Sequence, residues 1–382
     1  MVSSFSDFLR PTCAVIDLAA LASNFDRLRS SLPEGCGMLC MVKADAYGHG
    51  AVAVSRKLVS LGTTALGVAT VEEGCELRDA GVKAPILVMG GLLGMGTAAI
   101  KVMLEADLTP VVHSAQVIDA LNEATRTTGK KVAVHLKIDT GMGRLGVRPE
   151  VLPTVMDHLK RASHLVLEGV MTHLAKVWEE AYTAMQVEHY QAATRLIEKE
   201  LGPIPIRHVA NSVASLQNDP VKLGDTGTWW ARPGIALYGS TAGALSDVKL
   251  SPVMSLHSRV ALVKWIPIGA KVSYACEFTA RRKTRLGVVP IGYADGYPWR
   301  LTGKAYVIVR EKLVPVIGRV TMDMIMVDLT DIDSASVSDE VILMGQQGNL
   351  AITVDQVSEW AGTIPYEVMC GVSKRIPRIY KG

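Results

Sequence analysis

The chain has 382 residues, of which 49% are hydrophobic and 20% are charged. This composition excludes disordered and collagen-like chains, and the length suits two or three domains that bury a full core without disulfides or a structural metal. The 40 Lys and Arg residues against 37 Asp and Glu give a net charge of +3, which is too balanced to predict nucleic-acid binding.

Cysteine usage and the N-terminal sequence both favour a cytoplasmic protein. The six cysteines form no Cys-x-x-Cys pair, which argues against a zinc ribbon, any other metal site of that kind and a disulfide framework. The opening MVSSFSDFLRPT lacks the basic and apolar regions of a secretory signal. The uncharged stretch 84–100 holds four glycines and Pro85 and is too short to span a membrane, so we expect a buried strand, a turn and the start of a helix there.

Short apolar runs rich in β-branched residues alternate with segments of helical spacing through the first two thirds of the chain. We expect strands at 38–42, 65–69, 85–89, 109–112, 132–138, 167–172, 206–210 and 231–238. Helical spacing appears between them, for example at 51–61, 71–80, 114–127, 151–161 and 183–201. Eight such units predict a closed parallel (β/α)8 barrel of the TIM type, which we place at residues 12–242.

The pattern changes after about residue 241. Apolar runs at 255–265, 285–292, 305–309, 314–317, 325–329 and 340–343 are separated only by turns, which leaves no room for parallel crossovers. We therefore expect a second, mainly antiparallel β domain at residues 243–382, with short helices at 354–361 and 366–373. Residues 1–11 are expected to pack on this second domain.

Polar side chains gather where the predicted barrel strands end, and in a barrel these ends converge on one mouth. A lone lysine there is usually a surface residue, and a lone barrel histidine is usually structural. Several such groups together favour an active site, and a desolvated lysine amine loses proton affinity and can form an imine. The residues in question are Lys43, Lys137, Asp139, Arg144, His173, Asn211, Ser212, Arg232 and Gly234.

A set of motifs in fixed order carries a resemblance to a known family. The motifs are VKADAYGHG, IDTGMGRLG, THL, HVANS, RPGIALYG, VSY, GYADGYP, GRVTMD and PYE. Each is weak alone, but the ordered set is specific and extends over nearly the whole chain. In these motifs the chain resembles the alanine racemase family, whose members are fold-type III enzymes.

The resemblance implies pyridoxal 5′-phosphate as the cofactor, bound covalently through Lys43. It places Arg232 against the pyridine nitrogen, which should then stay neutral because an arginine, with a pKa above about 12, hardly gives up its proton. The glycine-rich stretch 90–96 lacks the ending of a phosphate-binding loop and is not assigned to phosphate. Other cofactor contacts fall by resemblance on Tyr47, His173, Asn211, Ser212, Gly234, Ile235 and Tyr366.

Racemisation removes the Cα proton on one face and returns a proton on the other, so it requires two acid–base groups. The resemblance assigns these roles to Lys43 and Tyr274, with Tyr274 and Met322 reaching the site from a second subunit. A homodimer with two shared sites is thus expected. His173 is the neighbour expected to lower the proton affinity of the tyrosine. From the residues alone, Tyr274 is a tyrosine on a strand face.

Substrate recognition is also assigned by resemblance. Arg144 is expected to hold the substrate carboxylate in a bidentate pair. Lys137 matches a lysine that many family members carry carbamylated, an anion that orients this arginine. The expected narrow entrance, formed by Tyr293, Ile364 and Tyr366, admits a small side chain.

The resemblance implies interconversion of L-alanine and D-alanine, which supplies D-alanine for peptidoglycan. A preference for serine or broad specificity stays open, since a mostly apolar pocket discriminates poorly against one added hydroxyl. A decarboxylase of the same architecture is a second alternative, which Arg232 opposes because those enzymes place an acidic group at the ring nitrogen. A non-enzymatic cofactor carrier is the third alternative. Such carriers consist of the barrel alone, whereas this chain has a second domain.

Overall fold

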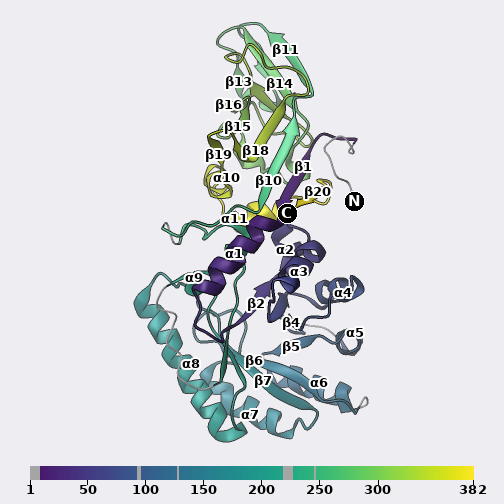
Figure 1. The fold of residues 1–382 in the computed structure, drawn as a ribbon, viewed down its shortest axis with the longest axis vertical. Coiled ribbons are helices and arrows are strands. Elements are labelled where there is room, and N and C mark those ends of the chain that lie inside the picture. The colour runs from purple at the N-terminus through teal and green to yellow at the C-terminus, as the bar shows by residue number, and fades with distance from the viewer. Residues whose placement is uncertain (1–8, 93–95, 127–128, 218–226, 245–246) are drawn as a thin grey trace.

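The computed structural model describes residues 9–92, 96–126, 129–217, 227–244 and 247–382, and it has two parts that follow one another along its long axis (Figure 1). A closed barrel with its helices forms the lower part of the view, and a large sheet forms the upper part. One continuous cluster of buried hydrophobic side chains runs through both parts. The two parts are therefore packed against each other rather than joined only by a linker.

The barrel has eight parallel strands, as predicted, and closes where Gly37 pairs with Trp230 and Met38 with Ala231. The residues of β2 to β4 are all buried, which explains why continuous apolar runs mark these strands in the sequence. The strands are β2 (Gly37–Met41), β3 (Ala65–Val68), β4 (Ile86–Val88), β5 (Thr109–Val112), β6 (Val132–Lys137), β7 (Leu165–Met171), β8 (Ile206–His208) and β9 (Thr228–Ala231).

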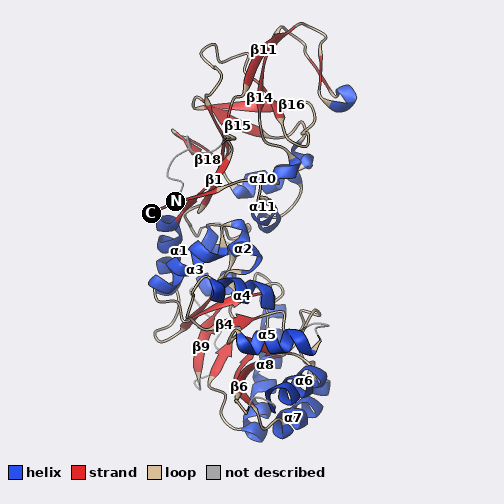
Figure 2. Ribbon diagram, turned by 90° about the vertical axis from the view of Figure 1, so that its right-hand side faces the viewer, coloured by secondary structure: helices blue, strands red, loops and turns tan. Residues whose placement is uncertain are grey.

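Helices connect the strands and cover the outside of the barrel (Figure 2). The segments with helical spacing form helices within the described residues, because each has an apolar face to bury. A capping box between Thr70 and Glu73 fixes the start of α4. The helices are α1 (Leu18–Ser30), α2 (Lys43–Gly48), α3 (Ala51–Ser60), α4 (Val71–Asp79), α5 (Thr97–Glu105), α6 (Ala115–Arg126), α7 (Leu152–Arg161), α8 (Glu180–Leu201) and α9 (Ser212–Leu216).

The last barrel strand lies earlier in the chain than predicted. The strand expected at 231–238 was wrong: β9 ends at Ala231, and Ile235–Tyr238 forms a 3-10 helix, η3. Pro233 has no N–H for a strand ladder, and glycine at 234 weakens extended structure. Arg232 and Gly234 therefore lie on the loop that follows the strand, over the mouth of the barrel.

The upper part is a mainly antiparallel sheet in the order β11-β14-β17-β16-β15-β18-β10-β1-β20. The run expected at 255–265 is two strands, β10 and β11, which lie far apart in this order. The elements are β10 (Met254–Arg259), β11 (Leu262–Ile266), β12 (Lys271–Val272), β13 (Phe278–Thr279), β14 (Thr284–Val289), β15 (Tyr306–Val309), β16 (Lys312–Ile317), β17 (Ile325–Asp328), β18 (Glu340–Gln347), β19 (Leu350–Ile352), α10 (Val354–Ala361), α11 (Pro365–Gly371) and β20 (Arg378–Lys381).

The N-terminal strand β1 (Cys13–Asp17) belongs to this sheet, where it pairs with β10 and β20. The chain then enters the barrel through α1, so the proposed division at 12–242 and 243–382 cuts through the sheet. Arg10 donates to the carbonyl of Pro290 and pairs with the buried carboxylate of Asp295. Residues 1–8 of the segment expected on the β domain lie outside the described residues.

Three features of the described residues bear on the class of the protein. No helix among them is both long enough and apolar enough to cross a membrane. In the same residues, no cluster of His, Cys, Asp and Glu side chains could hold a metal ion. The six cysteines are all free thiols. Within 84–100, β4 and the start of α5 appear where they were expected, and 93–95 lie outside the described residues.

Candidate active site

A cavity of about 710 Å³ opens at the mouth of the barrel, lined by residues that follow the ends of several strands. It brings together most of the residues singled out in the sequence, although they come from distant parts of the chain. These are Lys43, Tyr47, Lys137, Arg144, His173, Asn211, Ser212, Arg232, Gly234, Ile235, Ile364 and Tyr366. Asp139 lies instead in a smaller pocket of about 280 Å³ beside α8.

Three further predicted site residues do not line this cavity. Tyr274, Tyr293 and Met322 lie on the β domain with 71%, 45% and 52% of their surface exposed. They sit on neighbouring loops. The Ser273 hydroxyl donates to the carbonyl of Arg319 (2.8 Å), and the Tyr293 N–H donates to the carbonyl of Thr321 (3.0 Å). In one chain, therefore, these side chains form an exposed group apart from the cavity.

Lys43 stands at the start of a backbone segment of unusual handedness. Ala44 to Tyr47, none of them glycine, all have φ between 52° and 54°. Left-handed helical backbone costs about 1–2 kcal/mol per residue, so the surroundings must hold this turn in place. The N–H of Ala51 donates to the Asp45 carboxylate (2.7 Å), and the ring of His49 donates to the carbonyls of Ala46 and Tyr47.

Arg232 lines the cavity and is anchored there by backbone carbonyls. Its two terminal nitrogens donate to the carbonyls of Thr172, His208 and Val209, which fixes the plane of the guanidinium. Its Nε–H has no hydrogen-bond acceptor among the described residues. Burial lowers the pKa of Arg232 to about 10, so the group stays charged at neutral pH. A fixed donor is thus available at the cavity wall.

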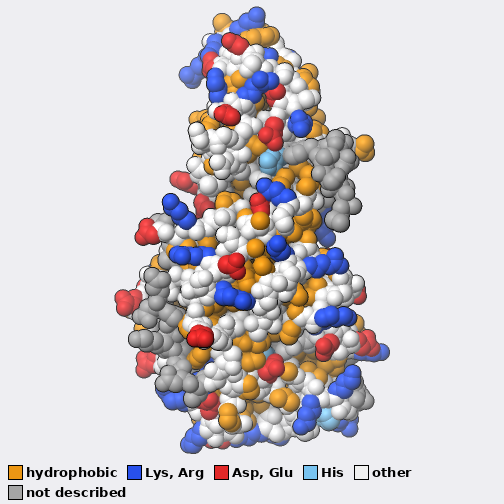
Figure 3. All heavy atoms as spheres, in the orientation of Figure 1, with side chains coloured by type: hydrophobic (Ala, Val, Ile, Leu, Met, Phe, Trp, Pro, Cys, Tyr) orange, Lys and Arg blue, Asp and Glu red, His pale blue; other side chains and the backbone are white. Residues whose placement is uncertain are grey.

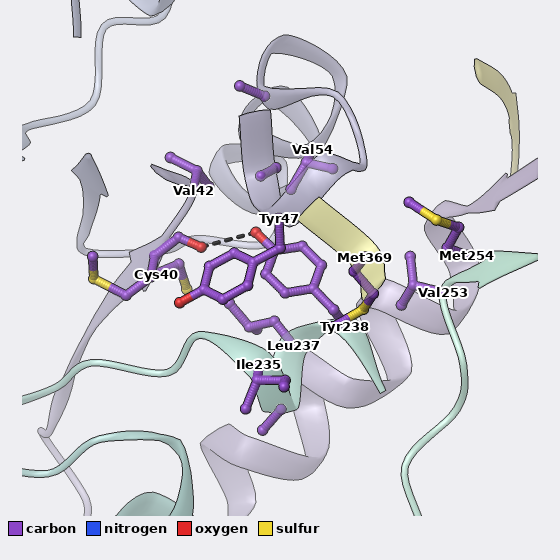
Figure 4. Packing of buried hydrophobic residues seen from close by; sticks show 14 of the residues in the cluster. Cys40, Val42, Tyr47, Val54, Ile235, Leu237, Tyr238, Val253, Met254 and Met369 are labelled. Carbon is purple, nitrogen blue, oxygen red and sulfur yellow. Dashed lines mark hydrogen bonds between the residues drawn. The ribbon is translucent and has the colours of Figure 1, made fainter. Parts of the chain in front are cut away.

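A hydroxyl and a close backbone approach form another wall. The Ser212 hydroxyl accepts the N–H of Gly234 (2.7 Å), and a Cβ at Gly234 would stand 2.5 Å from the Tyr47 hydroxyl. The rings of Tyr47 and Tyr238 face each other with centroids 4.8 Å apart, and the Tyr238 hydroxyl donates to the carbonyl of Met41 (Figure 4). Only glycine at 234 leaves space for the Tyr47 hydroxyl.

The helix α11 brings the C-terminal end of the chain to the mouth. It packs on α2, and Figure 4 shows Met369 beside Tyr238 in this contact. From this position Ile364 and Tyr366 line the cavity, with the ring of Tyr366 6.0 Å from that of Tyr47. The sheet domain therefore contributes directly to the entrance of the barrel.

The cavity wall is rich in cationic groups. Burial, followed by the charge of Arg144, lowers the pKa of Lys43, and burial with Arg232 and Arg144 lowers that of Lys137 to about 8. Burial and Arg232 also lower the pKa of His173 to about 3, so its imidazole is neutral at ordinary pH. Such a site attracts anions and has a lysine amine that loses its proton easily.

Sequence reasoning missed two kinds of site residue. Apolar side chains line much of the cavity, and they resembled ordinary core residues: Met41, Met89, Met142, Leu145, Met171, Leu174 and Val177. Glu73 was also missed, although its carboxylate accepts the N–H of Ala44 at 2.7 Å. The Thr-Val-Glu-Glu sequence at 70–73 signals a helix cap, but not this contact.

Known proteins resemble this chain over nearly its whole length. The family model for the N-terminal domain of alanine racemase matches residues 16–242, and that for the C-terminal domain matches 253–380. Alanine racemases of Geobacter sulfurreducens and Symbiobacterium thermophilum are 40% and 41% identical, over 97% and 98% of both chains. The solved alanine racemase of Streptomyces coelicolor superposes with a TM-score of 0.90 at 34% identity, over 99% of each chain. The chain therefore belongs to the alanine racemase family of enzymes.

Proposed function

We propose that this chain interconverts L-alanine and D-alanine with pyridoxal 5′-phosphate as cofactor, and that its active unit is a homodimer. The observation that carries the proposal is the shared cavity of Lys43, Arg144 and Arg232. It combines an amine of lowered proton affinity, a guanidinium suited to a carboxylate and a rigidly held second guanidinium.

The lining fits the proposed cofactor. Arg232 would donate a hydrogen bond to the ring nitrogen of the cofactor, and it would hold that nitrogen neutral because an arginine hardly releases its own proton. Ser212, Tyr47 and the backbone at Gly234 lie together, as a phosphate requires, in the position after the last strands where barrels commonly bind one. His173, Asn211, Ile235 and Tyr366 complete the proposed cofactor contacts.

When bound, the cofactor supplies an electron sink for the charge left at Cα as a proton departs. The remaining work falls to the protein's own groups. Lys43 Nζ exchanges a proton on one face of the substrate, and Tyr274 of the partner subunit exchanges a proton on the other. The exposure of Tyr274 and its absence from the cavity of its own chain support this division. Met322 and Tyr293, on adjoining loops, would accompany it.

Arg144 would bind the substrate carboxylate, and Lys137 would orient it. We propose that Lys137 is carbamylated, since its lowered pKa leaves a larger share of neutral amine to react with carbon dioxide. The carbamate replaces a cation beside two arginines by an anion. Trapping with labelled carbon dioxide followed by peptide mass analysis should find the label at Lys137, and its absence there would contradict this point.

Alanine is the proposed substrate because Ile364 and Tyr366 stand at the entrance of the cavity. The proposed role is the supply of D-alanine for peptidoglycan. A cytoplasmic location is proposed as well, supported by the six free cysteines, because disulfides are typical of oxidising compartments.

The test is exchange of the Cα proton. Cofactor-loaded protein in deuterated water should incorporate deuterium into both enantiomers of alanine and interconvert them, as followed by mass spectrometry and chiral chromatography. Folded, loaded protein that exchanges no Cα proton would overturn the proposal. L-serine run in parallel decides substrate preference, and faster turnover of serine would replace alanine as the proposed substrate.

A single substitution tests the second acid–base group. Tyr274→Phe should lower the rate from L-alanine by about 10²–10⁴-fold, the usual contribution of a positioned acid or base. Cofactor binding, followed by absorbance, should change little, because Tyr274 is not one of the proposed cofactor contacts. Loss of cofactor with the rate would instead make Tyr274 a structural residue.

A further inference from the structure

Glu73 connects the backbone that carries Lys43 to the neighbouring barrel segment. One carboxylate oxygen accepts the N–H of Ala44, the residue after Lys43, at 2.7 Å. The other accepts the N–H groups of Ala69 at 2.6 Å and Thr70 at 3.3 Å, where β3 ends and α4 begins. A single side chain thus joins the chain after β2 to the chain after β3.

The contact is made where the backbone most needs support. Ala44 is the first of four consecutive residues in the left-handed region, and it is exposed. Later residues of the turn are held from inside by Asp45 and His49. At Ala44 the side-chain acceptor comes from α4 instead. Among the described residues, no other side chain hydrogen-bonds the first peptide after Lys43.

We propose that Glu73 is a positioning residue, which fixes the backbone from which Lys43 enters the cavity and sets a negative charge against the cations around the amine. This inference rests on the proposed function of Lys43. The two charges act on Lys43 in opposite directions, as expected from their signs: Arg144 lowers the pKa of Lys43, whereas Glu73 raises it. Glu73 therefore does two things, one geometric and one electrostatic, which different substitutions separate.

The test uses the reaction of Lys43 with pyridoxal 5′-phosphate in cofactor-free protein, trapped with borohydride and located by peptide mass analysis. The capture rate is measured against pH, which gives a plateau rate and a midpoint. Glu73→Gln removes the charge and leaves one side-chain acceptor oxygen for the three N–H groups of Ala44, Ala69 and Thr70. We expect a plateau roughly 10–100-fold lower, typical of a displaced reacting group, and a midpoint at lower pH.

Matched variants separate the two effects and the effect on helix stability. Glu73→Asp keeps the charge but shortens the reach, so its midpoint should stay while its plateau falls part of the way. Glu72→Gln alters an exposed neighbour in the same helical turn and should change neither value. Thr70→Ala removes the acceptor for the Glu73 N–H, so it should lower the unfolding midpoint yet leave capture intact.

Wild-type capture by folded Glu73→Gln would overturn the inference. Equal loss of capture in Thr70→Ala would also overturn it, because Glu73 would then only cap a helix. If Glu73→Gln does not fold, Glu73→Asp decides, and a wild-type plateau there counts against the proposal. Failure of the proposed function gives a different result: capture at another lysine, or capture at Lys43 without Cα exchange in the loaded wild type.

Discussion

His173 illustrates what burial does to a single side chain at the barrel mouth. In the unmodified, cofactor-free chain its neighbours are Arg232, Lys137, Arg144 and Lys43, all cationic, and both burial and these charges oppose a further proton. At neutral pH the imidazole is therefore neutral, and it can accept a hydrogen bond. The same surroundings leave Arg232 charged, because the ordinary pKa of a guanidinium is so much higher.

The lowered pKa of His173 predicts how stability depends on pH. Between pH 6.5 and about 3 the unfolded chain binds a proton at this position that the folded chain does not, so stability falls as pH falls through that range. His173→Gln should lose less unfolding free energy than wild type between pH 7 and 5, by about 1–2 kcal/mol. Urea unfolding at both pH values measures this. The exposed His189→Gln serves as control, and identical slopes in wild type and His173→Gln would contradict the prediction.

At the scale of elements, the entrance depends on the contact between α2 and α11. Gly48 follows the left-handed turn with a φ of 81°, and a Cβ there would stand 2.2 Å from the carbonyl of Met369. Any residue other than glycine at position 48 would therefore prevent this close approach of α11, the helix at whose start Ile364 and Tyr366 lie. The shape of the cavity mouth follows from this contact.

Two glycine substitutions separate backbone strain from this contact. Gly62 has the same φ of 81°, but only one atom, on Arg29, lies within 4 Å of a Cβ there. Gly62→Ala should cost about 1 kcal/mol of unfolding free energy, the strain of left-handed backbone. Gly48→Ala should cost a further 1–3 kcal/mol, roughly, because α11 must move. Chemical denaturation measures both, and equal losses would show that the contact is not tight.

At the scale of the whole molecule, the residues proposed for one active site lie in two separate parts of the chain. The cavity is in the barrel, whereas Tyr274 and Met322 are exposed on the sheet domain. On the face shown in Figure 3, basic and acidic side chains are interspersed, whereas the cavity brings together several cationic groups. A second copy that supplies Tyr274 would complete each site.

Mixing two inactive variants tests the shared site. Lys43→Ala and Tyr274→Phe should each be inactive as homodimers. After dissociation and reassociation, half the dimers are mixed, and each holds one intact site and one doubly altered site. About a quarter of wild-type activity should return, as two-fold symmetry requires. No recovery despite mixed dimers, detected by differential tagging, would place both groups in the same subunit.

Patterns along the chain predicted the elements with good accuracy where the signal was local. Seven of the eight barrel strands, the succession of short antiparallel strands and the helix at 354–361 follow from apolar periodicity and turn residues. The boundary at 231–238 was wrong because an apolar run was taken for a strand although Pro233 and Gly234 interrupt it. The site residues at strand ends were found because a barrel collects these ends at one mouth.

What the sequence determined by itself is the fold class and the polar groups that share the cavity. Only the tertiary structure decided that β1 joins the distant sheet, that α11 closes over the left-handed turn, and that Glu73 reaches Ala44. These contacts join residues far apart in the chain, and no local periodicity encodes them. The exposure of Tyr274 is of the same kind, because a side chain's surroundings depend on how separate elements pack.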